Sequence, residues 1–174
     1  MRVAIALYFA AWVSLIVEVR DVSASGSWHV RRTASGGPRA KEEHYSDLVD
    51  RVHRQVNEFR RVHGLKPLML DPLISAQARE HSADMAQKGK TISHSGFNQR
   101  LQEIGKKIPY RAAAENVAAS VGYKNPAQTA VEGWKNSPEH RKNMLGDFSL
   151  TGIGVAQSAD GGYFFTQIFL KPAK

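Results

Sequence analysis

A first helix is predicted by the spacing of apolar residues after Tyr45. Four of them recur at intervals of three or four positions, as they do on one face of an α-helix. They are Leu48, Val52, Val56 and Phe59. The pair His63-Gly64 supplies a stop signal, so we expect the helix to end there.

Three further helices are expected downstream. Asp71-Pro72 and Asn125-Pro126 each place a capping residue directly before a proline, which is typical of a helix N-terminus. The second helix then runs to near Gly89, a short third helix covers residues 97–104, and a fourth begins at residue 126. The expected buried stripes are Ile74, Ala78, His81 and Met85 in the second helix, and Ala127, Ala130, Val131 and Trp134 in the fourth.

Alternating patterns predict a small antiparallel sheet. GIGVAQ (residues 152–157) and YFFTQIF (residues 163–169) flank the turn sequence ADGG, as in a β-hairpin. ENVAASV (residues 115–121) is a third expected strand. Helices flanking such a sheet form an α+β layered domain, which is the fold class that we predict.

The N-terminus is typical of a secretory signal peptide. Arg2 precedes the apolar run VAIALYFAAWVSLIV, and small residues follow, so we expect a signal peptide over residues 1–25 with a cut after Ala24. The apolar run is shorter than the roughly 20 residues of a spanning helix, although the charges after it leave an uncleaved membrane anchor as the alternative. Residues 26–44 lack periodicity and are interpreted as a flexible linker, with one domain over residues 45–174.

Charge and cysteine content narrow the setting of the protein. The formal net charge is +8, which favours contact with anionic surfaces, although a merely soluble basic surface explains it equally well. No nucleic-acid motif is visible, so we expect no nucleic-acid partner. The chain has no cysteine and is held by core packing alone, which suits a secreted or periplasmic bacterial protein, and we expect a monomer.

Three polar residues stand out as candidates for a functional site. His94 and His140 each lie at the end of an expected element, whereas His81 lies on an apolar helix face and is interpreted as a hydrogen-bonded core residue. Glu115 opens an apolar strand, where a carboxylate is costly unless another group pairs with it. The spacing of His94, Glu115 and His140 matches no compact zinc pattern, so spacing alone does not unite them.

A resemblance to a known family unites them. The ordered motifs HSADMAQKG, ISHSGF, AENVA, GWKNSPEHRKNML and GIGVAQ with YFFTQIF resemble the CAP superfamily in its bacterial branch. This superfamily includes the cysteine-rich secretory proteins, antigen 5 and the pathogenesis-related proteins, and its domain is also called sperm-coating-protein-like. The resemblance covers residues 45–171 and implies an α-β-α sandwich with a central cleft.

The resemblance also implies a set of cleft residues. The family's cleft holds two histidines and two acids, and His94, Glu115 and His140 match three of these four positions. The second acid falls three positions after the helix tryptophan, which here is Trp134, so Ser137 stands in its place. Family members have been associated with divalent cations at the histidine pair, so zinc or a similar ion is the expected cofactor.

Several alternatives remain open from the sequence. Ser137 before Pro138 is the pattern of a helix cap, which we favour over a catalytic serine. His94, Glu115 and His140 either hold a metal, with Glu115 as a ligand or second-shell partner, or form a hydrogen-bonded cluster without one. The expected function is a binding module for an envelope component, a lipid or a surface partner. The alternatives are a metal-assisted extracellular hydrolase or peptidase and an adhesion module with a vestigial cleft.

Overall fold

The computed structural model describes residues 37–88 and 91–173. The expected signal peptide and most of the expected linker lie outside these residues. The described elements are α1 (Pro38–Val62), β1 (Met69–Leu70), α2 (Pro72–Gln87), α3 (Phe97–Gly105), β2 (Tyr110–Ser120), α4 (Pro126–Asn136), α5 (Pro138–Met144), β3 (Leu150–Gln157) and β4 (Tyr163–Pro172).

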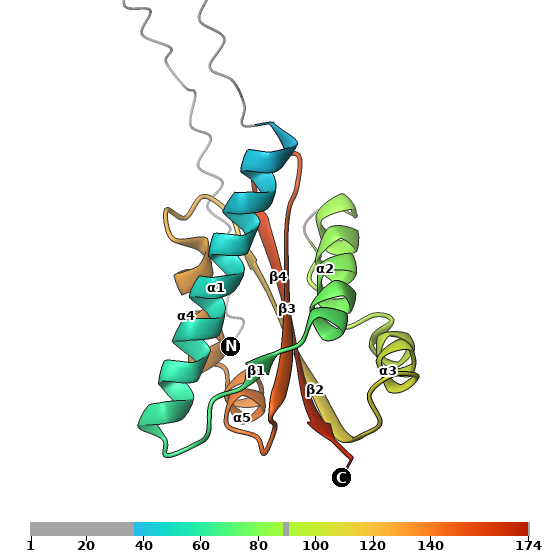
Figure 1. The fold of residues 1–174 in the computed structure, drawn as a ribbon. Coiled ribbons are helices and arrows are strands. Elements are labelled where there is room, and N and C mark those ends of the chain that lie inside the picture. The colour runs from blue at the N-terminus through green and yellow to red at the C-terminus, as the bar shows by residue number, and fades with distance from the viewer. Residues whose placement is uncertain (1–36, 89–90, 174) are drawn as a thin grey trace, which may run out of the picture. The chain divides into compact units, whose positions relative to one another are not determined.

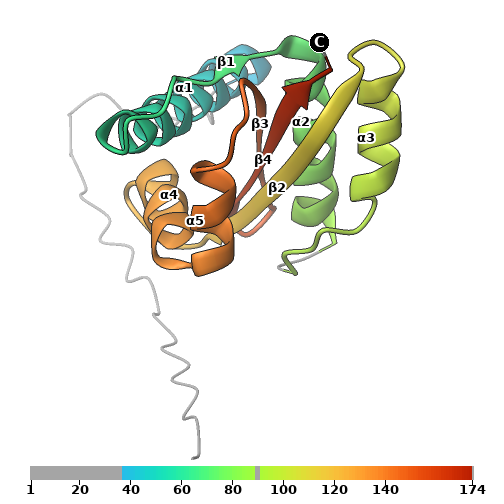
Figure 2. The same ribbon diagram turned by 90° about the horizontal axis from the view of Figure 1, so that it is seen from below.

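Helices cover both faces of one four-stranded sheet. The strand order is β1-β3-β4-β2, in which β4 pairs antiparallel with both β2 and β3. Helices α1, α4 and α5 lie on one face, and α2 and α3 lie on the other (Figures 1 and 2). The predicted α-β-α sandwich is therefore confirmed.

The sheet is mixed rather than purely antiparallel. Met69 and Leu70 form β1, which pairs in parallel with the start of β3. A strand of two residues is too short to show an alternating pattern, which is why the sequence did not reveal it. Strand β2 also begins earlier than predicted, at Tyr110 rather than at Glu115. The sequence pattern missed this start because the three alanines before Glu115 have low strand propensity.

The first helix begins earlier than expected. The sequence predicts a linker over residues 26–44, but α1 starts at Pro38 and runs continuously to Val62. Proline is favoured in the first helical turn, where its missing N–H costs no hydrogen bond, and the segment GGPRA contains this start signal. Near its start, the His44 ring lies 2.9 Å from the Tyr163 hydroxyl of β4.

Two glycines allow α2 to pack directly on β3. A Cβ atom at Gly152 would lie 2.2 Å from the backbone of Ile74, and one at Gly154 would lie 2.2 Å from the backbone of Ala78. These distances are far inside van der Waals contact, so only glycine fits at either position. Ser82 of α2 reinforces this contact by donating a hydrogen bond to the Gly154 carbonyl.

The tryptophan of α4 lies in the core, as its helical stripe predicts. Trp134 is 1% exposed and packs with buried residues of α1 and the sheet. Its indole Nε1 donates a hydrogen bond of 3.0 Å to the Val117 carbonyl of β2. Among the described residues, no helix is long and apolar enough to cross a membrane.

Candidate functional site

Glu115 of β2 forms a buried ion pair with Arg100 of α3. Its side chain is 1% exposed, and both of its oxygens accept hydrogen bonds from Arg100 of α3. The shortest of these bonds measures 2.7 Å, and Arg100 also donates to the Ser95 carbonyl. A carboxylate buried at the sheet is stable here because a guanidinium neutralises it at two points.

His94 is oriented by the same carboxylate. It lies in the segment between α2 and α3, and its Nδ1 lies 3.0 Å from Oε1 of Glu115. A carboxylate paired with Arg100 acts as an acceptor, so Nδ1 is the donor and Nε2 carries the lone pair. The side chain is 54% exposed, so this Nε2 is directed by a buried group but stays within reach of a ligand.

His140 reaches the site from the opposite layer. It lies on α5, and its ring centroid is 6.5 Å from that of His94, with the two rings tilted by 34°. Asn116 donates to the His140 carbonyl and accepts a hydrogen bond from Asn143. Successive side chains of a strand point to opposite faces, so Glu115 holds His94 while the next residue of β2 holds α5.

The electrostatic setting keeps both His140 and His81 uncharged near neutral pH. Burial and the proximity of His94 lower the pKa of His140, and the nearby Glu139 offsets this only in part. Burial also lowers the pKa of His81. A neutral imidazole is the form that donates a lone pair to a metal ion.

His81 is a buried, hydrogen-bonded residue next to the site, as its position on an apolar helix face predicts. It is buried, and its Nε2 donates a hydrogen bond of 2.6 Å to the Ser93 carbonyl. This bond fixes the backbone next to His94. The interpretation of His81 as a hydrogen-bonded core histidine is confirmed.

Ser137 lies at the junction of α4 and α5. It is the residue directly before Pro138, the first residue of α5, so it occupies the expected N-cap position. Its hydroxyl nevertheless makes no capping hydrogen bond. Neighbouring Glu139 is exposed and reaches the site only through its charge on His140.

Sequence reasoning missed Arg100, although a signal for it was present. Phe97, Leu101 and Ile104 form the apolar stripe of α3, and Arg100 falls within that stripe. A charged residue on a buried helix face needs a partner, just as Glu115 does on its strand. Two such residues of opposite charge are natural partners.

In this arrangement the Glu115 carboxylate orients the His94 ring. Both Glu115 oxygens are engaged, so this carboxylate is not free to accept a proton from water. The two imidazoles offer two neighbouring lone pairs. Among residues 37–88 and 91–173, no cluster of three or more histidine, aspartate or glutamate side chains is arranged to hold a metal ion.

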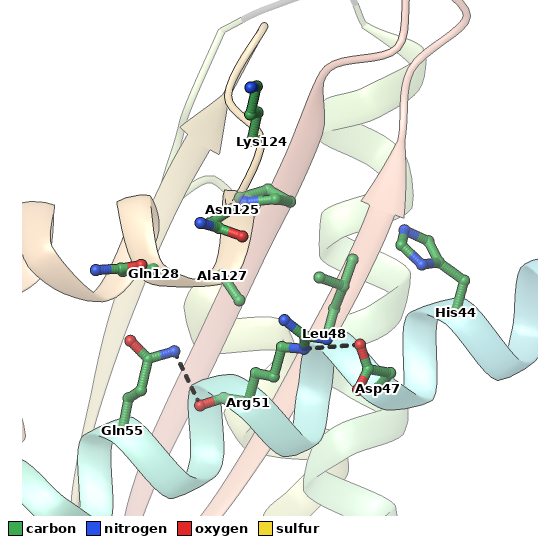
Figure 3. Close-up of a pocket in the computed structure, with 10 residues that line it drawn as sticks. His44, Asp47, Leu48, Arg51, Gln55, Lys124, Asn125, Ala127 and Gln128 are labelled. Carbon is green, nitrogen blue, oxygen red and sulfur yellow. Dashed lines mark hydrogen bonds and ion pairs between the residues drawn. The ribbon is translucent and has the colours of Figure 1, made fainter.

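A separate pocket lies between α1 and the start of α4 (Figure 3). It encloses about 360 Å³ and includes His44, Arg51 and Asn125, but none of the predicted cleft residues. Arg51 is paired with Asp47 at 2.7 Å across one turn of α1. This pocket is distinct from the site around Glu115.

The fold is an α-β-α sandwich in which His94 and His140 lie beside each other next to the edge strand β2. The model of the cysteine-rich secretory protein family, CAP, matches residues 53–169. The chain belongs to this family.

Bacterial proteins are among its relatives. The chain is 34% identical over 125 residues to Bacillus subtilis YkwD, which covers 69% of this chain and 46% of that protein. It is 35% identical over 121 residues to the B. subtilis membrane protein YlbC, which covers 66% of this chain and 32% of that protein. The chain thus spans less than half the length of these relatives.

A solved structure shows the same fold. The SCP domain of an extracellular protein from Bacillus anthracis matches with a TM-score of 0.64 and 30% identity, over 77% of this chain and 43% of that one.

Proposed function

We propose that this protein is an exported binding module whose cleft holds an exchangeable divalent ion between His94 and His140. The observation that carries the proposal is the hydrogen bond between Glu115 and His94. Its carboxylate orients His94 through Nδ1 and leaves Nε2 available beside a second, neutral imidazole. Histidines that bind a metal ion commonly donate their other ring N–H to a carboxylate in this way, which fixes the orientation of the ring.

The donor set suits a weakly held ion rather than a structural one. Structural zinc sites are closed by four protein ligands, whereas the described residues offer two imidazoles here. An ion at these residues would keep open positions for oxygen donors of a ligand. Such a ligand fits the expectation of an anionic envelope component, since the chain carries a formal charge of +8.

The hydrolase alternative has less support. It assigns the role of general base to Glu115, which must then take a proton from water. Both oxygens of Glu115 are bound by Arg100 and one also by His94, and the side chain is buried. The same contacts that orient the imidazole therefore leave no oxygen poised as a base, which favours binding over turnover.

Calorimetric titration with zinc tests this proposal. The parent chain should bind close to one equivalent, and His94→Ala and His140→Ala should each abolish the heat of binding. Ser137→Ala is the matched control at the edge of α5 and should bind as the parent does. Retention of zinc by both histidine variants would show that the cluster fixes the cleft by hydrogen bonds alone.

A further inference from the structure

Two apolar side chains are exposed together in the loop between β2 and α4. Val121 is 48% exposed and Tyr123 is 62% exposed, and all of residues 121–125 lie at the surface. Gly122, which lies between them, has a positive φ of 76°, and a Cβ atom placed on it would meet no atom within 4 Å. The described residues therefore leave the tip of this loop uncovered.

The loop lies at the end of the sheet where the chain enters the domain. Val121 follows Ser120, which pairs with Tyr163, and the Tyr163 hydroxyl lies 2.9 Å from the ring of His44 in α1. His44 is about two helical turns from Gly37, the residue before α1. Figure 1 also shows the start of α1 and the turn between β3 and β4 at the same end of the domain. The residues that precede Gly37 therefore join the domain at this end.

The sequence before Gly37 points to a membrane. It contains the apolar run VAIALYFAAWVSLIV, residues 3–17, which we expect to serve as part of a signal peptide or as an anchor. In either case export brings the domain to the surface of a bilayer. An uncovered apolar loop at the end where this sequence joins the domain is well placed to meet that surface.

The charges at this end favour an anionic surface. Lys124 of the loop is exposed and pairs with no carboxylate of the described residues. Lys41 of α1, whose Nζ lies 5.7 Å from the ring centroid of Tyr45, pairs with none of these carboxylates either. Asp160, in the turn between β3 and β4, accepts a hydrogen bond from Ser158. The first three acids of α1 each lie beside an arginine: Glu42 beside Arg79, Glu43 beside Arg39, and Asp47 beside Arg51. The two lysines are therefore available to anionic groups outside the fold.

A lipid surface suits this loop better than a protein partner does. A stable protein interface buries about 800 Å² on each partner, which is more than two neighbouring side chains supply. Shallow binding at a bilayer needs only a few apolar side chains together with basic residues. Tyrosine is enriched at membrane–water interfaces, because its ring is apolar and its hydroxyl is polar. Lysine beside it is attracted to anionic headgroups.

We propose that the loop of residues 121–125 docks on the surface of an anionic bilayer. Val121 and Tyr123 enter the headgroup region, and Lys124 and Lys41 contact the lipid phosphates. This docking does not depend on a metal ion in the protein, so it stands or falls separately from the proposed function.

A fluorophore on the loop tests the proposal in the full chain. The chain has no cysteine, so Tyr123→Cys and Met69→Cys each create a single site for NBD, whose emission rises in apolar surroundings. Met69 is the matched control, because it is also 62% exposed but lies on β1, which pairs with the opposite end of β3. On phosphatidylglycerol vesicles, emission should rise about twofold or more at position 123, with quenching by spin-labelled lipid, and stay unchanged at position 69. Equal changes at both positions, or bound chain with no change at position 123, would overturn the proposal.

Variants at exposed lysines separate docking from general attraction. In the chain labelled at position 123, Lys124→Gln should raise the lipid concentration for half-maximal emission about fivefold, the effect of one basic residue near an anionic surface. Lys107→Gln is the matched control, since Lys107 is also exposed but precedes the opposite end of β2. It should leave that concentration within about twofold, because surface charges more than a Debye length away are largely screened. Equal losses in both variants would show non-specific attraction and refute the docking surface.

Two further conditions distinguish the occupant of the loop. Neutral phosphatidylcholine vesicles should give a weaker response than phosphatidylglycerol vesicles, and an equal response would contradict the role of the lysines. The emission at position 123 should not change with the concentration of the chain when no vesicles are present. A rise under that condition would show that a second copy of the chain covers the loop, and it would overturn the assignment to lipid.

Discussion

Arg100 and Glu115 form a buried two-point ion pair that joins α3 to the edge strand β2. The exposed ring of His94 is hydrogen-bonded to the same carboxylate. A rigid buried charge therefore sets the direction of a solvent-accessible imidazole. This relationship makes Arg100 a positioning residue for His94, although it lies outside the histidine pair.

Loss of Arg100 should be strongly destabilising. Arg100→Met leaves the Glu115 charge buried without its partner, so we expect the free energy of unfolding to fall by about 3–5 kcal/mol. The double variant Arg100→Met with Glu115→Gln removes that charge and should recover part of the loss. Urea denaturation of the two variants checks this. A single variant as stable as the parent would contradict the role of the ion pair.

Trp134 should contribute both packing and a hydrogen bond. Trp134→Ala is expected to cost about 3–5 kcal/mol, as for other large aromatic residues in cores. Trp134→Phe keeps most of the ring but leaves the Val117 carbonyl without its donor, so we expect a loss of about 1–3 kcal/mol. If the alanine variant were as stable as the parent but lost its ligand, Trp134 would be a binding residue instead.

Gly154 should not tolerate a methyl group. Gly154→Ala places a Cβ atom against the backbone of α2, and we expect a loss of more than about 3 kcal/mol in unfolding free energy. Gly133→Ala is the matched control, because its Cβ meets no atom within 4 Å on the exposed side of α4. That variant should gain roughly 0.5–1 kcal/mol from helix propensity. Equal effects at both positions would refute the close packing of α2 on β3.

Acidification should destabilise the domain through the half-buried His140 and the buried His81. The pKa of His140 is lowered in the folded chain, so the unfolded chain binds a proton first as the pH falls. Stability is therefore complete above the unfolded value of about 6.5 and declines below it. Lowered pKa at His81 acts in the same direction. Thermal unfolding at pH 8, 7, 6 and 5 should show a decline only below pH 7, smaller in His140→Gln. A decline of the same size in that variant would contradict this origin.

The sequence predicted the elements better than the contacts between them. Asp71-Pro72 and the stripe of Trp134 sufficed to locate α2 and α4, because caps and periodicity are local properties. The pairing of His94 with Glu115 joins positions 21 residues apart, which no local pattern encodes. Only the family resemblance brought these residues together. Arg100 was not predicted because no local pattern identifies Glu115, 15 residues further along the chain, as its partner.

Anomalous diffraction at the zinc edge, from crystals of the parent chain grown with zinc, tests the central claim most directly. We expect one strong peak between His94 and His140, about 2.0–2.1 Å from Nε2 of His94 and from one nitrogen of His140. Glu115 should stay bound to Arg100 and Nδ1 of His94 beside it. A peak at other residues, or none between the two rings at saturating zinc, would contradict the proposal that this cleft is a metal site.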